Sequence, residues 1–194
     1  KRHPFRPVWA DQLSGVFTNR KMVLAVLALL PKVEKLKGDR VGVLMPASCI
    51  STLLYLAVQF AGKTPVMINW TVGNRNMRSC LESVPLESIL TSQALVERLK
   101  GTGVDFTGIE EKFVMLESLK ESIGLLPKLV AFLRSRFWWR KLWKAKIRDE
   151  AVVLFTSGSE TNPKAVPLTQ QNLMVDVTNA AADMNIQKDY CLLG

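Results

Sequence analysis

Apolar and polar residues alternate along the chain in blocks that predict strands and helices in turn. Residues 41–46 are a short apolar run that predicts a buried strand, and Ser48 then precedes an apolar stretch that predicts a helix ending near Gly62. The alternation continues, with strands expected at 64–70, 88–92, 112–116 and 151–155, helices at 74–84 and 170–184, and further apolar segments at 164–169 and 190–193. This pattern predicts an α/β fold, a mostly parallel sheet covered by helices on both faces.

The longest uninterrupted apolar run is residues 22–30, which Pro31 closes. Its nine residues are too few to cross a bilayer, which takes about 20. No small-residue cleavage site follows, and the run continues into a charged stretch, so a signal peptide is the poorer interpretation. We expect a buried amphipathic helix here and no transmembrane helix.

Composition is that of one globular unit. The chain has 194 residues, of which 48% are hydrophobic and 22% charged, so residues 1–194 are long enough for one α/β domain. The three cysteines are odd in number and far apart, which makes a zinc site or a disulfide framework a poor interpretation and favours buried thiols in the cytosol. The first residue is Lys1, so we expect sequence to be missing upstream.

The net charge of +9 is concentrated in one segment. Residues 128–148 contain eight basic residues and no acidic one, and three of the five tryptophans. If the segment is helical, Arg136, Arg140, Lys144 and Arg148 form a cationic stripe, and the tryptophans occupy most of the opposite side. We therefore expect a basic, aromatic, helical insertion at about 125–148.

Three interpretations of this segment remain open. The tryptophans can pack on the domain and leave the cations in water. Alternatively, the segment can lie in an anionic membrane surface or bind nucleic acid. Nucleic acid is the least favoured, because no nucleic-acid-binding fold accompanies the segment. The membrane interpretation assigns lipid contact to Arg136, Trp138, Trp139, Arg140, Trp143 and Lys144.

The polar turn after the strand at 151–155 carries the candidate chemistry. It reads Thr-Ser-Gly-Ser-Glu-Thr-Asn-Pro-Lys over residues 156–164, and its hydroxyls and backbone N–H groups can converge on phosphate oxygens. Lys164 adds a cation that suits a phosphate. A solvated turn is the alternative, since these residue types are ordinary turn formers. A Walker-type phosphate loop is excluded, because Pro163 and Ala165 stand where glycine and Ser or Thr belong.

The order of residues in 154–173 resembles the phosphate-loop signature of adenylate-forming enzymes, which include acyl-CoA synthetases, peptide-synthetase adenylation domains and luciferases. Matching positions upstream are Gly38-Asp-Arg-Val41, Met45-Pro46, Ala61-Gly62, Pro65 and Asn69, and matching positions in the turn are Thr156, Ser157, Gly158, Ser159, Pro163, Lys164 and Val166. The resemblance covers about residues 38–194. Within the family, residues 67–73, 89–92 and 157–160 look most like the acyl-carrier-protein synthetase part of bacterial bifunctional enzymes that are also 2-acylglycerophosphoethanolamine acyltransferases.

The resemblance implies the first part of the large N-terminal domain of these enzymes, without the rest of the active site. It implies ATP-dependent activation of a long-chain fatty acid through an acyl-adenylate, with Mg²⁺, and transfer to acyl carrier protein in phospholipid recycling. In this interpretation Lys164 is catalytic, Thr156 also meets the metal, and ATP is bound by Thr156, Ser157, Gly158, Ser159, Glu160 and Lys164. The expected location is the cytoplasm, at the inner face of a bacterial membrane.

Two rival functions remain open. Coenzyme A can replace acyl carrier protein as the acceptor. A catalytically drifted scaffold or membrane-binding module is the rival from another class, because Thr161 and Ala165 stand where the family usually has glycine and Gln170 stands at the usual histidine. A side chain at a glycine position can narrow the loop or forbid a positive φ.

Overall fold

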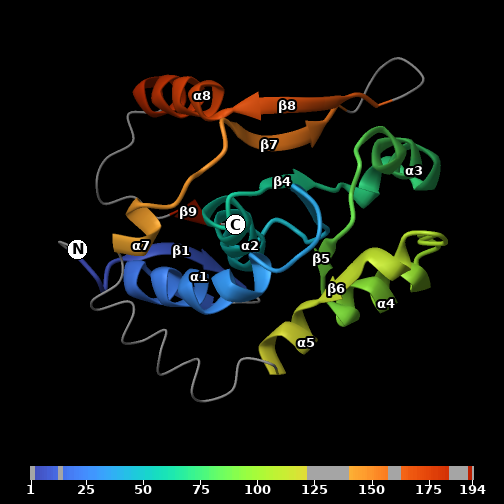
Figure 1. Cartoon of the computed structure of the whole chain (residues 1–194), viewed down its shortest axis with the longest axis horizontal. Coiled ribbons are helices and arrows are strands. Elements are labelled where there is room, and N and C mark those ends of the chain that lie inside the picture. Colours follow the sequence, from blue (N-terminus) through green and yellow to red (C-terminus); the bar gives the residue numbers. More distant parts are fainter. Residues whose placement is uncertain (1–2, 13–14, 122–139, 157–162, 184–191, 194) are drawn as a thin grey trace.

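The computed structural model describes residues 3–12, 15–121, 140–156, 163–183 and 192–193 (Figure 1). The secondary structure alternates between strands and helices over most of this length. In chain order it comprises β1 (Pro7–Asp11), β2 (Gly15–Thr18), α1 (Asn19–Val33), β3 (Arg40–Val43), α2 (Cys49–Phe60), β4 (Thr64–Met67), a 3₁₀ turn (Trp70–Val72), α3 (Asn74–Ser83), β5 (Ile89–Thr91), α4 (Gln93–Gly101), a second 3₁₀ turn (Glu110–Lys112), β6 (Phe113–Met115), α5 (Leu116–Glu121), α7 (Arg140–Trp143), β7 (Glu150–Phe155), β8 (Ala165–Thr169), α8 (Gln170–Asp183) and β9 (Leu192–Leu193).

Six strands form the central sheet, in the order β6-β5-β3-β4-β7-β8. Neighbours from β6 to β7 pair in parallel, and β8 at the edge pairs antiparallel with β7. Gly42 lies in the middle of this sheet, where an added Cβ would stand 2.9 Å from side-chain atoms of both Ile68 and Ile89. The prediction of an α/β fold with a mostly parallel sheet is confirmed.

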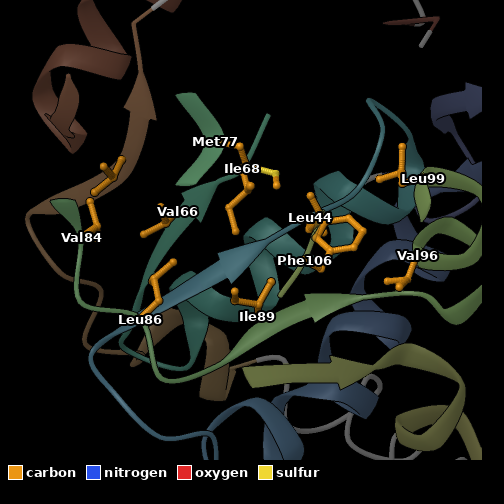
Figure 2. Close-up of a cluster of buried hydrophobic side chains, with 11 residues drawn as sticks. Leu44, Val66, Ile68, Met77, Val84, Leu86, Ile89, Val96, Leu99 and Phe106 are labelled. Atoms are coloured by element: carbon orange, nitrogen blue, oxygen red, sulfur yellow. The ribbon is translucent and has the colours of Figure 1, made fainter. Parts of the chain in front are cut away.

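Each face of the sheet has its own apolar core. One cluster unites residues of α3, α4 and the sheet around Phe106, which is 1% exposed (Figure 2). The other packs α1, α2 and α5 on the opposite side, with Val33, Val41, Leu54 and Leu90 fully or almost fully buried. These strands are covered on both sides, which is why they appear in the sequence as continuous apolar runs rather than alternating ones.

The helix after β3 begins as its sequence indicates. Ser48 is the N-cap of α2, and its hydroxyl accepts a hydrogen bond from the N–H of Ser51 at 3.2 Å. Asp11 of β1 adds a carboxylate at the same helix end, where Oδ2 accepts from the N–H of Cys49 at 2.6 Å. A negative charge is favourable at a helix N-terminus. The contact therefore attaches the N-terminal hairpin β1–β2, which the sequence did not predict, to the central domain.

The prediction of a helical insertion at about 125–148 is wrong for its last residues. Within the described residues, α7 ends at Trp143, and residues 145–148 are not helical. Arg148 lies instead in an extended connector, where its Nε donates to the carbonyl of Gly62 at 3.1 Å and its Nη2 pairs with Asp39 at 2.8 Å. Because of these tertiary contacts, Arg148 is not part of a helical cationic stripe with Arg140 and Lys144. Residues 125–139 of the predicted insertion lie outside the described residues.

The run at 22–30 forms part of α1, which has Val26, Leu27, Leu30 and Val33 buried. Pro31, which ends the apolar run, lies inside α1, and the helix continues to Val33. None of the helices in the described part of the chain has the length and apolar character needed to cross a bilayer.

Candidate active site

The polar turn connects β7 and β8, which pair as an antiparallel hairpin up to the two ends of the turn. Phe155 and Ala165 are the last cross-strand partners, and one step further the N–H of Thr156 donates to the carbonyl of Lys164 at 3.1 Å. The N–H of Lys164 donates in return to Oγ1 of Thr156 at 3.2 Å. The hairpin therefore places the first and last residues of the polar turn side by side.

Burial holds this base in position. Ala151, Val152 and Val153 of β7 are buried, and so is Pro163 immediately before Lys164. The side chains of Thr156 and Lys164, in contrast, are exposed. A rigid strand thus presents two polar side chains to solvent at its carboxyl end.

Among the described residues, only the N–H of Lys164 is hydrogen-bonded to the Thr156 hydroxyl, which leaves that hydroxyl with capacity for a ligand. A hydroxyl carries one proton and two acceptor lone pairs, and the Lys164 N–H occupies one of these lone pairs. The proton can be donated to a phosphate oxygen, or the free lone pair can meet Mg²⁺. Together with the exposed ammonium group of Lys164, this donor set fits a magnesium-bound polyphosphate.

The adjacent strand contributes a second polar residue to the same edge. Val66 of β4 pairs in parallel with Val153 of β7, so Asn69 and Thr156 each lie three residues beyond that pair. The Asn69 side chain is already engaged, because Oδ1 accepts from the backbone N–H of Thr71 at 2.9 Å and from its hydroxyl at 2.8 Å. Asn69 therefore shapes the turn that follows β4.

Four of the predicted nucleotide-binding residues lie outside the described residues: Ser157, Gly158, Ser159 and Glu160. Their roles stay predictions, as does the metal contact assigned to Thr156. Thr161 also lies outside the described residues.

Ala165 is accommodated without backbone strain. It is the first residue of β8, in an extended strand opposite Phe155, so it needs no positive φ. Its side chain packs with that of Phe155 against the core cluster around Phe106. The methyl group therefore points into the domain at this position.

Gln170 connects the end of the hairpin to the helix layer. Its Nε2 donates to Oε1 of Gln59 at 3.2 Å and to the carbonyl of Arg148 at 3.3 Å. Gln59, which is 6% exposed, also donates through Nε2 to the carbonyl of Ala151 in β7. This contact was not predicted, because Gln59 is 111 residues from Gln170 and no local pattern marks it.

The residues predicted to contact a membrane are only partly described. Arg136, Trp138 and Trp139 lie outside the described residues, and of Arg140 the structure describes the backbone in α7. Trp143, the last residue of α7, and Lys144 are exposed. A connector leads from α7 to the start of β7 (Figure 1).

A mostly parallel α/β sheet with a polar turn after an inner strand is an arrangement that occurs in nucleotide-binding domains. The model of the AMP-binding enzyme family matches residues 23–193. The chain belongs to this family.

Solved structures share the fold at low sequence identity. VinN superposes with a TM-score of 0.71 at 17% identity, covering 95% of this chain and 46% of VinN. The o-succinylbenzoate CoA synthetase MenE from Bacillus subtilis, in complex with its acyl-adenylate intermediate OSB-AMP, gives a TM-score of 0.67 at 16% identity, over 96% of this chain and 44% of MenE. MenE is also known in complex with ATP and a magnesium ion.

A curated protein matches a shorter part of the chain. The hybrid PKS-NRPS synthetase poxE of Penicillium oxalicum is 50% identical over 50 residues, which is 26% of this chain and 1% of that protein. The chain thus spans less than half the length of these relatives and neighbours.

Proposed function

We propose that this chain is the nucleotide-binding part of an enzyme that activates a long-chain fatty acid by adenylation with ATP. The observation that carries the proposal is the pairing of Thr156 with Lys164 at the carboxyl end of β7, inside a segment that matches the AMP-binding family. The domain holds both side chains at one point and leaves them exposed to a ligand.

In the proposed reaction a carboxylate oxygen of the fatty acid attacks the α-phosphorus of ATP. A new P–O bond forms, the bond to the bridging oxygen breaks, and pyrophosphate leaves with that electron pair. Lys164 counters charge on the phosphate oxygens, and the Thr156 hydroxyl donates a hydrogen bond, so both act by positioning and electrostatic stabilisation. Bound Mg²⁺ supplies further neutralisation of the phosphate charge.

Two departures from the family pattern are compatible with catalysis. Ala165 sits in an unstrained strand with its side chain against the core, so it does not narrow the turn. Gln170 uses its amide to attach α8 to Gln59 and to the connector before β7. Neither residue obstructs the described base of the turn, so neither favours the drifted scaffold, which is the rival from another class.

The choice of a long-chain fatty acid as substrate and of acyl carrier protein as acceptor is based on a sequence resemblance. Residues 67–73, 89–92 and 157–160 resemble the acyl-carrier-protein synthetase part of bacterial bifunctional enzymes. We propose that the phosphopantetheine thiol of acyl carrier protein displaces AMP from the acyl-adenylate, giving a thioester used in phospholipid recycling. Coenzyme A carries the same thiol and is the rival acceptor.

The test is acid-dependent ATP–pyrophosphate exchange by the complete parent protein. Exchange with a long-chain fatty acid and none with amino acids supports the proposal, whereas exchange with amino acids alone overturns the fatty-acid assignment. A second assay offers acyl carrier protein and coenzyme A separately and follows thioester formation by mass spectrometry. Thioester on coenzyme A alone selects the rival acceptor. No exchange with any acid selects the scaffold.

A further inference from the structure

Large apolar side chains are exposed beside free cations in the connector between α7 and β7. Trp143 is 81% exposed and Ile147 is 42% exposed. Lys144 and Lys146, which are also exposed, lie between them in the sequence. Such a combination within residues 143–147 is suited to a binding partner that takes both apolar area and positive charge.

The connector is held in one conformation by the domain behind it. Within it, the N–H of Ala145 donates to the carbonyl of Leu142 at 3.3 Å, and the N–H of Ile147 donates to that of Ala145 at 3.1 Å. At its end Arg148 is fixed by Gly62 and Asp39. The connector also approaches Gly62 closely, since a Cβ built there would stand 3.2 Å from the carbonyl oxygen of Lys146. The exposed side chains therefore project from a fixed backbone.

Two cations near the connector, Lys144 and Lys146, are not neutralised by a described acidic side chain. Asp39 offsets Arg148 at 2.8 Å, and Arg40 offsets Glu150 at 2.8 Å. Asp149 is the remaining exposed acid beside the connector. Among the described residues, Lys144 and Lys146 form no ion pair.

We propose that Trp143, Lys144, Lys146 and Ile147 form a docking surface for an anionic lipid bilayer. Trp is suited to the boundary between headgroups and acyl chains, and lysines beside it are attracted to anionic headgroups. A bilayer also covers Ile147, which has no flat ring on which a nucleic-acid base can stack. Nucleic acid is accordingly the less suitable partner.

The docking surface and the phosphate turn lie at opposite ends of β7. The connector enters β7 at Glu150, and Thr156 follows its last residue, Phe155 (Figure 1). Six residues of strand separate the two ends by about 20 Å. Docking would therefore leave the phosphate turn accessible, and the two activities can be tested independently.

The experiment measures co-sedimentation of the 194-residue chain with vesicles of phosphatidylcholine alone or mixed with phosphatidylglycerol. We expect binding to the anionic vesicles. Lys144→Gln with Lys146→Gln should weaken it about 30-fold, since each lysine near such a surface contributes about 1 kcal/mol. Trp143→Ala should weaken it about tenfold, which corresponds to about 1.5 kcal/mol for burying a large apolar side chain.

The matched control removes two positive charges from another part of the surface. Arg75→Gln with Arg98→Gln removes two cations on α3 and α4 that are exposed and form no ion pair among the described residues, far from the connector (Figure 1). This double variant should bind anionic vesicles nearly as well as the wild type. An equal loss in both double variants would show a net-charge effect and overturn the docking surface.

Other outcomes also overturn the proposal. One is equal binding to neutral and anionic vesicles, and another is no binding to either. A third is binding of single-stranded DNA that the Lys144 and Lys146 substitutions abolish while vesicle binding stays unchanged.

An adenylation assay tests the docking surface and the proposed function separately. In the complete protein without membranes, the connector variants should keep wild-type ATP–pyrophosphate exchange, whereas an inactive wild type that binds vesicles normally would refute the adenylation alone.

Discussion

Arg40 and Glu150 form a two-point ion pair across the start of the central sheet. Nε and Nη2 of Arg40 donate to Oε1 and Oε2 of Glu150, each at 2.8 Å. Arg40 begins β3 and Glu150 begins β7, which are separated in the sheet by β4. The pair therefore bridges two strands that do not pair with each other, at the sheet end opposite the phosphate turn.

Replacing Glu150 by Gln should lower the free energy of unfolding by about 1 kcal/mol at neutral pH, because the pair is two-pointed but its side chains are partly exposed. The matched control is Glu110→Gln, which breaks the more exposed pair with Lys100 and should cost less than about 0.5 kcal/mol. Urea unfolding of the three chains measures both differences. Equal costs would show that the bridge adds nothing beyond a surface ion pair.

The same pair predicts how stability depends on pH. The hydrogen bond from Arg40 holds the pKa of Glu150 below its usual value, against an opposing effect of burial. A carboxyl group with a lowered pKa in the folded state stabilises the fold above its unfolded pKa, and this contribution is lost as pH falls through the folded pKa. Unfolding measured from pH 7 down to pH 3 should therefore show a shallower loss for Glu150→Gln than for wild type. Parallel curves would contradict this.

Thr91 and Thr64 should respond in opposite ways to the same substitution. Both side chains are 0% exposed in strands, but the Thr64 hydroxyl donates to the carbonyl of Glu150 at 3.3 Å, whereas the Thr91 hydroxyl has no hydrogen-bond partner in the described part of the chain. Valine has nearly the same shape and no polar atom. Thr91→Val should raise the free energy of unfolding by about 1 kcal/mol, and Thr64→Val should lower it by a similar amount. Thermal unfolding of both variants measures the difference, and a destabilised Thr91→Val would refute it.

The thiol of Cys49 should be almost inert. Burial raises the pKa of Cys49 to about 11, and the Asp11 carboxylate adds to the shift. The thiolate is the reactive form, so at pH 8 about one thiol in a thousand is reactive. Peptide mass spectrometry after iodoacetamide treatment should find Cys49 unmodified in the folded chain and modified in urea. Asp11→Asn, which removes the charge, should speed modification of the folded chain, and an unchanged rate would rule out the contribution of Asp11.

Much of the sheet could be predicted because its strands are buried on both faces. Val41 and Val43 on one side of β3 and Leu44 near its end are almost fully buried, so the strand appears as an unbroken apolar run. Ser48 marked the start of α2 for a local reason, namely the hydrogen bond of its hydroxyl to the first turn. The polar turn after β7 could be located because its residue order resembles a family signature.

Other features depend on contacts between distant parts of the chain. The hairpin β1–β2 is half exposed and pairs β1 with Leu192–Leu193, so no local pattern indicates it. The helical periodicity of 140–148 was overridden after Trp143, because Arg148 gains Asp39 and Gly62 as partners in an extended backbone. Contacts of this kind cannot be inferred from spacing alone.

Lys164 should affect adenylation far more than stability. Its side chain is exposed, and its two backbone hydrogen bonds to Thr156 do not involve the ammonium group, so Lys164→Ala should change the free energy of unfolding by less than about 0.5 kcal/mol. Loss of one charged contact to a transition state costs about 2–4 kcal/mol, or roughly 10²–10³ in rate. In the complete protein, fatty-acid-dependent ATP–pyrophosphate exchange should fall by that factor while the urea midpoint stays unchanged. Lys144→Ala, which removes another exposed lysine beyond the other end of β7, is the matched control and should leave exchange in solution intact. A wild-type rate in Lys164→Ala, or an equal loss in Lys144→Ala, would refute the role assigned to the Lys164 ammonium group.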